Sequence, residues 1–97
     1  MNMQAMLKQA QALQKDMLKA KEEVDNTEFV GESSLVKVVM KGTKEIVEVK
    51  INADSLDKED IEALQDMLVV AINQAGSKVD ETMEKKMGKF GNIPGLF

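Results

Sequence analysis

The residues of this 97-residue chain with the clearest capacity for binding chemistry are lysines. Lys8, Lys15 and Lys19 fall within roughly 40° of one another if their segment is an α-helix. Lys78 and Lys85 lie seven residues apart and project to one side of a second helical pattern. Ammonium groups segregated in this way can contact phosphate. By charge alone, the commoner explanation of such lysines is a solvated helix face with surface ion pairs, each of which contributes only tenths of a kcal/mol.

The residue types limit how a nucleic acid could be recognised. All thirteen basic residues are lysines, so the bidentate arginine fork that most often recognises guanine is missing. Phe29, Phe90 and Phe97 are the only aromatic residues, too few for a platform that stacks single-stranded bases. Any nucleic-acid binding is therefore expected to be contact with the phosphates of a duplex, weak and steeply dependent on salt.

The composition argues against catalysis and against metal or cofactor binding. The chain has no histidine, cysteine, tyrosine or tryptophan, which removes the usual general base near neutral pH, the thiol nucleophile and the best metal ligands. Asp54, Asp57 and Asp60 recur at three-residue intervals, whereas an EF-hand loop needs ligands at alternate positions. Helix capping explains these acids better. We therefore expect no enzymatic activity, no cofactor, no metal site and no small-molecule substrate.

Two helical patterns carry the lysines. The second is predicted from a capping Asp57 to Gly88, a length of about 45 Å. Residues 67–72 within it are apolar all round, so they should be buried against the sheet and against a second surface, which a homodimer would supply most simply. The first is predicted from about Asn2 to Asp25. Its apolar positions repeat with heptad spacing opposite the lysines, and they are Met6, Ala10, Leu13, Met17, Ala20 and Val24.

A β-hairpin is predicted between the helices. Residues 35–41 and 45–52 are rich in β-branched residues and are joined across Gly42 and Thr43. Residues 27–31 are a further short strand candidate. The second face of the hairpin mixes apolar and charged residues, so it faces either water or a second subunit. The opposite face of the hairpin is predicted to be fully apolar, and it consists of Val36, Val38, Met40, Val47, Val49 and Ile51.

Length and charge indicate how the chain is organised. One domain is expected over residues 1–88, followed by a flexible tail over residues 89–97. Residues 1–24 carry four lysines and three acids (+1), residues 25–77 five lysines and eleven acids (−6), and residues 78–97 four lysines and three acids (+1). Only the ends therefore suit an anionic ligand. The absence of cysteine, of a secretory signal and of a continuous apolar run predicts a soluble cytoplasmic protein that does not contact membranes.

The order of these motifs resembles one family, the bacterial nucleoid-associated DNA-binding proteins called YbaB/EbfC. The matching segments cover essentially the whole chain and are MNMQAMLKQAQALQKDM, LVKVVMKGTKEIVEVKI, NADSLDKEDIEALQDMLVVAINQA and MGKFGNIPGLF. The resemblance implies an α+β fold, with an α-β-β-β-α protomer in which two long amphipathic helices flank a small antiparallel sheet. It also implies a tweezer-like homodimer whose protruding helices embrace double-stranded DNA, and a role in organising the nucleoid and influencing gene expression.

Family DNA contacts are attributed to charged residues on the protruding first and last helices. The positions that suit this description here are Lys8, Lys15, Lys19, Lys21, Lys78, Lys85, Lys86 and Lys89. They would contact phosphates, and the dimer would bend or bridge the duplex. The competing hypothesis is an adaptor that docks onto a DNA-repair or replication protein through the apolar seam of Met6, Leu13 and Met17, without contacting DNA itself.

Overall fold

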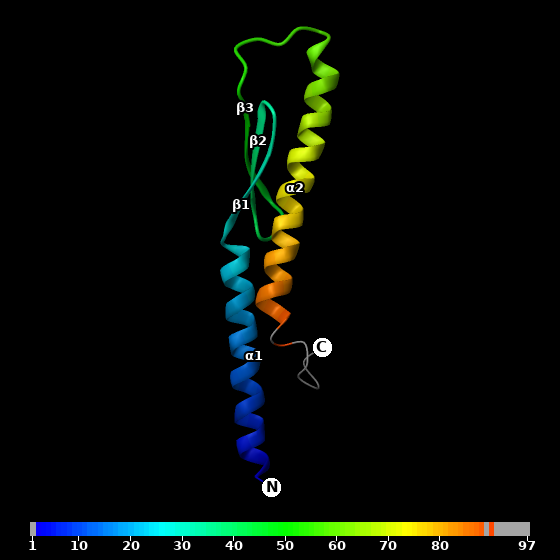
Figure 1. Ribbon diagram of the computed structural model, residues 1–97. Coiled ribbons are helices and arrows are strands. Elements are labelled where there is room, and N and C mark those ends of the chain that lie inside the picture. The colour runs from blue at the N-terminus through cyan, green and yellow to red at the C-terminus, as the bar shows by residue number, and fades with distance from the viewer. Residues whose placement is uncertain (1, 89, 91–97) are drawn as a thin grey trace.

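The computed structural model describes residues 2–88 and residue 90, and it shows an elongated protomer of 72 × 18 × 13 Å (Figure 1). Much of α1 projects away from the sheet, while α2 runs beside both the sheet and part of α1. This arrangement confirms the predicted α+β fold, in which two long helices flank a small antiparallel sheet. The elements in order are α1 (Met3–Asp25), β1 (Glu28–Ser33), β2 (Val36–Lys41), β3 (Ile46–Ile51) and α2 (Asp60–Gly88).

Side chains satisfy backbone groups at both ends of α1. The Oδ1 atom of Asn2 accepts hydrogen bonds from the N–H groups of Gln4 (3.1 Å) and Ala5 (3.4 Å). These are donors that the first turn of a helix leaves without intrahelical partners. At the other end the hydroxyl of Thr27 donates to the carbonyl oxygen of Glu23 over 2.6 Å. The predicted boundaries of this helix are therefore confirmed to within one residue.

The three strands form an antiparallel sheet in the order β1-β2-β3, and β2 with β3 forms the predicted hairpin. In its turn Lys44 has a φ of 73°, a left-handed conformation that is uncommon for residues other than glycine. β1 extends to Ser33, beyond the strand candidate at residues 27–31. A register shift pairs Met40 with Ile46, not with Val47 as regular alternation predicts. The bulge therefore interrupts the predicted apolar face at the start of β3.

α2 begins at Asp60, later than the predicted cap at Asp57. The carboxylate of Asp60 accepts a hydrogen bond from the N–H of Asp57 (3.0 Å), and the carbonyl oxygen of Asp57 accepts one from the N–H of Asp60 (2.9 Å). These reciprocal bonds form a turn that leads into the helix. Asp60 and Glu62 place negative charge in the first turn of α2, and Lys85 and Lys86 place positive charge in its last turn, as the helix dipole favours.

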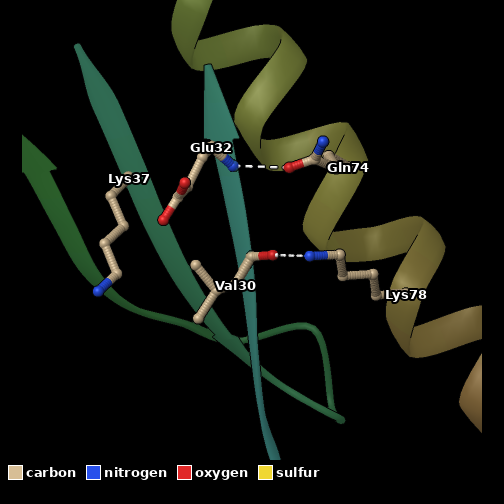
Figure 2. Close-up of a pocket in the computed structure, with 5 residues that line it drawn as sticks. All are labelled: Val30, Glu32, Lys37, Gln74 and Lys78. Atoms are coloured by element: carbon tan, nitrogen blue, oxygen red, sulfur yellow. Dashed lines mark hydrogen bonds between the residues drawn. The ribbon is translucent and has the colours of Figure 1, made fainter. Parts of the chain in front are cut away.

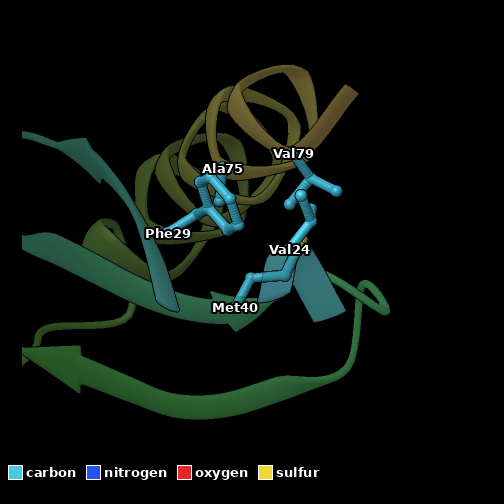
Figure 3. Close-up of a cluster of buried hydrophobic side chains, with 5 residues drawn as sticks. All are labelled: Val24, Phe29, Met40, Ala75 and Val79. Carbon is cyan, nitrogen blue, oxygen red and sulfur yellow. The ribbon is translucent and has the colours of Figure 1, made fainter. Parts of the chain in front are cut away.

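Two clusters of buried apolar side chains hold α2 against the sheet. Burial of Val36, Val38 and Met40 confirms the inner face predicted for β2. Full burial of a valine of this kind stabilises the fold by about 1.5 kcal/mol or more. One cluster consists of Val36, Val38 and Ala71. The other joins the end of α1 to the sheet and α2, and Figure 3 shows its members Val24, Phe29, Met40, Ala75 and Val79.

Two glycines allow the helices to approach the sheet closely. A Cβ atom on Gly31 in β1 would collide with the carbonyl oxygen of Ala71 in α2. A Cβ atom on Gly42 in the hairpin turn would collide with the carbonyl oxygen of Val24 in α1. Backbone therefore lies directly on backbone at both places, and neither position has room for a side chain.

β3 is left uncovered by the helices of the protomer. α2 packs against β1 and β2, and all six residues of β3 are exposed. A helix about 10 Å wide covers only about two strands that are spaced about 4.8 Å apart. The predicted apolar face is therefore buried on β2 but open on β3. Val69 and Val70 of α2 are also 57% and 52% exposed, so the apolar stretch at residues 67–72 is covered on one side only.

Candidate nucleic-acid interface

Lys8, Lys15 and Lys19 lie exposed on α1. Ala20 and Val24 are buried on the side of α1 that meets the rest of the protein, so the three lysines point into solvent, as the helical periodicity predicts. Within the described part of the chain, none of the three ammonium groups forms an ion pair or a side-chain hydrogen bond. All three are available to an external anion.

The first half of α1 carries no acidic residue. Asp16 is the first acid in the chain, so Lys8 and Lys15 are the only charged side chains between residues 2 and 15. Figure 1 shows that this part of α1 projects beyond the C-terminal end of α2. Because this projecting half of α1 carries no acid, its lysines can reach an anionic ligand with little repulsion from neighbouring carboxylates.

Lys85 and Lys86 add positive charge from α2. Both are exposed in the last turn of that helix. The Nζ atom of Lys86 lies 3.7 Å from the Oε2 atom of Glu23 on α1, a solvent-exposed pair of little net energy that a phosphate could replace. Because α1 and α2 pack against each other, lysines from opposite ends of the sequence lie on neighbouring helices.

The remaining predicted lysines have different surroundings. Lys21 forms an ion pair with Asp25 across 3.5 Å. The ammonium group of Lys78 donates a hydrogen bond to the carbonyl oxygen of Val30 over 2.6 Å and so is directed at the sheet (Figure 2). Lys89 and the rest of the predicted tail lie outside the described residues, with the exception of Phe90, which is buried. Of the described candidates, Lys78 is thus the one held at the sheet.

The opposite end of the molecule is acidic. Asp54, Asp57 and Glu59 lie in the connection from β3 to α2, and Asp60 and Glu62 follow in the first turn of the helix. We call these five residues the acidic end. Figure 1 shows it far from the N-terminus of α1. These carboxylates would repel phosphate, so of the two ends of the molecule the α1 end is the more favourable for an anionic ligand.

The surface offers little for other chemistry. A hollow of about 590 Å³ between β1 and α2 is lined by Val30, Glu32, Lys37, Gln74 and Lys78 (Figure 2). Across residues 2–88 and 90, no three His, Cys, Asp or Glu side chains are gathered so that they could ligate a metal ion. The same residues include no helix with an apolar stretch suited to spanning a bilayer. The exposed lysines are therefore the candidate site.

The role of Gln74 is not apparent from the amino-acid sequence. Its Oε1 atom accepts a hydrogen bond from the N–H of Glu32 over 2.7 Å, one turn of helix before the Lys78 contact. The available signal was the four-residue spacing of two long polar side chains beside the buried positions Ala71 and Ala75. That spacing alone does not distinguish a contact with the sheet from contact with water.

Proteins of similar sequence carry names that concern DNA. A family model described as the YbaB/EbfC DNA-binding family matches residues 1–93. A nucleoid-associated protein from Lactococcus lactis subsp. cremoris (strain MG1363) is 49% identical over 92 residues, with 93% of each chain covered. One from Streptococcus suis (strain 05ZYH33) is 45% identical over 97 residues, which cover 97% of this chain and 98% of the relative. The crystal structure of an uncharacterised protein, HP0035, from Helicobacter pylori matches with a TM-score of 0.75 and 26% sequence identity, over 93% of this chain and 97% of that one.

Proposed function

Since the chain belongs to the YbaB/EbfC DNA-binding family, we propose that it is a nucleoid-associated protein that binds duplex DNA through the phosphate backbone. The observation that supports this most directly is the projecting, acid-free first half of α1, far from the acidic end. Relatives named nucleoid-associated proteins support a cytoplasmic role at the nucleoid. The proposed contacts are Lys8, Lys15, Lys19, Lys21, Lys85, Lys86 and Lys89.

Contact by lysine alone has consequences for specificity. An ammonium group neutralises phosphate as a compact point charge, and it lacks the planar fork that distinguishes guanine from the other bases. Affinity comes from the release of counterions and falls as salt rises. The protein therefore binds many sequences with similar affinity, changes the path of the duplex by holding it at several points, and influences gene expression through DNA shape without catalysing a reaction.

A homodimer joined through the uncovered apolar surface is part of this proposal. β3 is an edge strand, so its outer backbone groups can pair with a second strand. Exposed apolar side chains along an uncovered strand are also typical of a protein interface. Two copies joined on this side would present two projecting α1 helices, which gives the tweezer-like shape. The surface, called here the open face, consists of the exposed β3 residues Ile46, Val47, Val49 and Ile51.

Val49→Glu should convert the dimer to monomers. Val49 is 46% exposed in the protomer and pairs with the buried Val38, so a glutamate there would be buried without a partner twice in a symmetric interface. We expect the dissociation constant of the dimer to rise by at least about 100-fold, as measured by sedimentation equilibrium. Glu48→Gln alters the neighbouring exposed residue and is the matched control, which should remain dimeric. A dimer that survives Val49→Glu would remove β3 from the interface.

Lys85→Glu combined with Lys86→Glu should weaken binding to every duplex by a similar factor. The double change replaces two cations per protomer with anions, so we expect a loss of about tenfold or more at low salt, independent of sequence. Electrophoretic mobility shift with several unrelated duplexes measures this. Lys37→Glu with Lys58→Glu makes the same change in net charge on the sheet and beside the acidic end, and it should have a smaller effect. Unchanged affinity in the Lys85 and Lys86 variant would remove both lysines from the site.

A further inference from the structure

The two edges of the sheet differ in how they are covered. β1 and β3 are the outer strands. On β1, the N–H of Glu32 donates to the Oε1 atom of Gln74 (2.7 Å), and the carbonyl oxygen of Val30 accepts from the Nζ atom of Lys78 (2.6 Å), as Figure 2 shows. Residues two apart on a strand present their backbone groups to the same edge. Both bonds are therefore made by backbone groups that would otherwise be open to another strand.

The geometry of the helix and the strand explains why two side chains suffice. Residues four apart on a helix lie about 6 Å apart along its axis, and residues two apart on a strand lie about 6.6 Å apart. Gln74 and Lys78 are therefore spaced to meet Glu32 and Val30 in turn. We call this pair of side chains the β1 clasp.

Gly31 brings α2 close enough for the β1 clasp to form. It lies between Val30 and Glu32, and a Cβ atom there would collide with the carbonyl oxygen of Ala71 and come within 2.8 Å of the backbone nitrogen of Ala75. The backbone of α2 thus lies against the backbone of β1. Shorter polar side chains at positions 74 and 78 could not make these hydrogen bonds, because the side chains must extend beyond the surface of α2 to the edge of β1.

No side chain among residues 2–88 and 90 is recorded as covering the β3 edge in this way. All six residues of β3 are exposed, and α2 packs against β1 and β2. Unpaired strand edges recruit further strands, and proteins that avoid open-ended assembly cover or charge them. A sheet with two open edges could add copies without limit, whereas a sheet with one open edge closes as a symmetric pair.

We propose that Gln74 and Lys78 close the β1 edge to strand addition, so that self-association of this chain is confined to the β3 side and stops at two copies. The inference rests on the proposed homodimer for its consequence in assembly. The two hydrogen bonds that the β1 clasp makes to β1 lie within a single protomer. Lys78 thus stabilises the edge of the sheet. Its ammonium group, which the sequence suggests for DNA contact, donates instead to the backbone carbonyl oxygen of Val30.

The test is the variant Gln74→Leu with Lys78→Met, which keeps most of both apolar stems and removes both polar ends. Hydrogen exchange by NMR should show the amide of Glu32 exchanging about tenfold faster, the change expected from losing one ordinary hydrogen bond. Sedimentation velocity should show species larger than the dimer that increase with protein concentration. Lys37→Met removes an ammonium group from the same hollow without touching the β1 edge, and it should behave as wild type in both measurements.

The proposal is overturned if the amide of Glu32 exchanges at the wild-type rate in the double variant, or if exchange is faster and no larger species form. If the double variant does not fold, the single variants are measured. Gln74→Leu should speed exchange of the Glu32 amide, Lys78→Met should leave that amide protected, and each should give some species larger than the dimer. Lys78→Arg keeps a donor to the carbonyl oxygen of Val30 and should assemble as wild type does. A wild-type protein that fails to bind DNA would contradict the proposed function and leave these outcomes unchanged.

Discussion

Gly31→Ala should destabilise the protein by about 3 kcal/mol, at the upper end of what overpacking a well-packed site costs. The added methyl group would collide with the carbonyl oxygen of Ala71 and would lie 2.8 Å from the backbone nitrogen of Ala75. Neither atom belongs to a flexible side chain that could turn away. Relief requires α2 to move off β1, which separates the apolar cluster of Val36, Val38 and Ala71.

Thermal unfolding followed by circular dichroism measures this effect. A loss of about 3 kcal/mol should lower the melting temperature by more than about 10 °C in a domain of this size. Gly76→Ala is the matched control, because Gly76 lies within α2 and a Cβ atom there meets nothing within 4 Å. Alanine in a helix interior is favoured over glycine by about 1 kcal/mol, so this control should be as stable as wild type or more stable. Equal melting temperatures for Gly31→Ala and wild type would mean that α2 does not lie on β1 as described.

Changing Lys8, Lys15 and Lys19 together to glutamine should reduce duplex affinity by about 100-fold at low salt. Each lysine lost from a phosphate contact lowers the slope of log affinity against log salt by about 0.9, and a dimer would lose the contacts of both copies. Exposed side chains away from packing usually change stability by less than about 0.5 kcal/mol when replaced. The variant should therefore fold and dimerise as wild type does.

The matched control for this variant is Lys37→Gln with Lys50→Gln and Lys58→Gln, which removes the same charge from the sheet and the acidic end. Fluorescence anisotropy with one labelled duplex compares the two proteins. We expect the control to retain most of the wild-type affinity and salt slope. Equal losses in both variants would show that net charge governs binding and would contradict a site on α1.

The helices and the hairpin could be predicted because their patterns are local. The four-and-three spacing through Leu13, Met17 and Ala20 specifies one helix face, and alternation through Val36 and Val38 specifies one sheet face. Both faces are buried or half-buried where another element reaches them. The start of α2 was harder to predict from the sequence, because Asp57 and Asp60 both suit a helix cap. The reciprocal hydrogen bonds between these two residues decide the boundary.

The covering of the sheet could not be predicted, because alternation says which side of a strand is apolar and not how far a helix extends across the strands. Val49 has the same pattern as Val38, but Val38 is fully buried and Val49 is 46% exposed. The β1 clasp also could not be predicted from the sequence. Its bonds join residues 42 and 48 positions apart in the sequence, and Gln74 and Lys78 are residue types that usually face water.

The candidate site was predictable in outline for the same reason as the helices. The spacing of Lys8, Lys15 and Lys19 places them together on α1, and the structure leaves all three exposed. The surroundings of Lys78 and Lys86 depend on contacts with β1 and with Glu23 on α1, which no local pattern contains. Position along the chain therefore identified candidate lysines, and the tertiary structure was needed to sort them.

The most direct test of the central claim is the salt dependence of duplex binding by the wild-type protein, measured by fluorescence anisotropy. A labelled duplex of about 30 base pairs spans about 100 Å and so exceeds the 72 Å length of the protomer. We predict a log–log slope of several units and equal competition by unrelated sequences, because lysines hold the phosphate backbone. Absence of binding at low salt would contradict that claim and would favour an adaptor that acts through the apolar seam of α1.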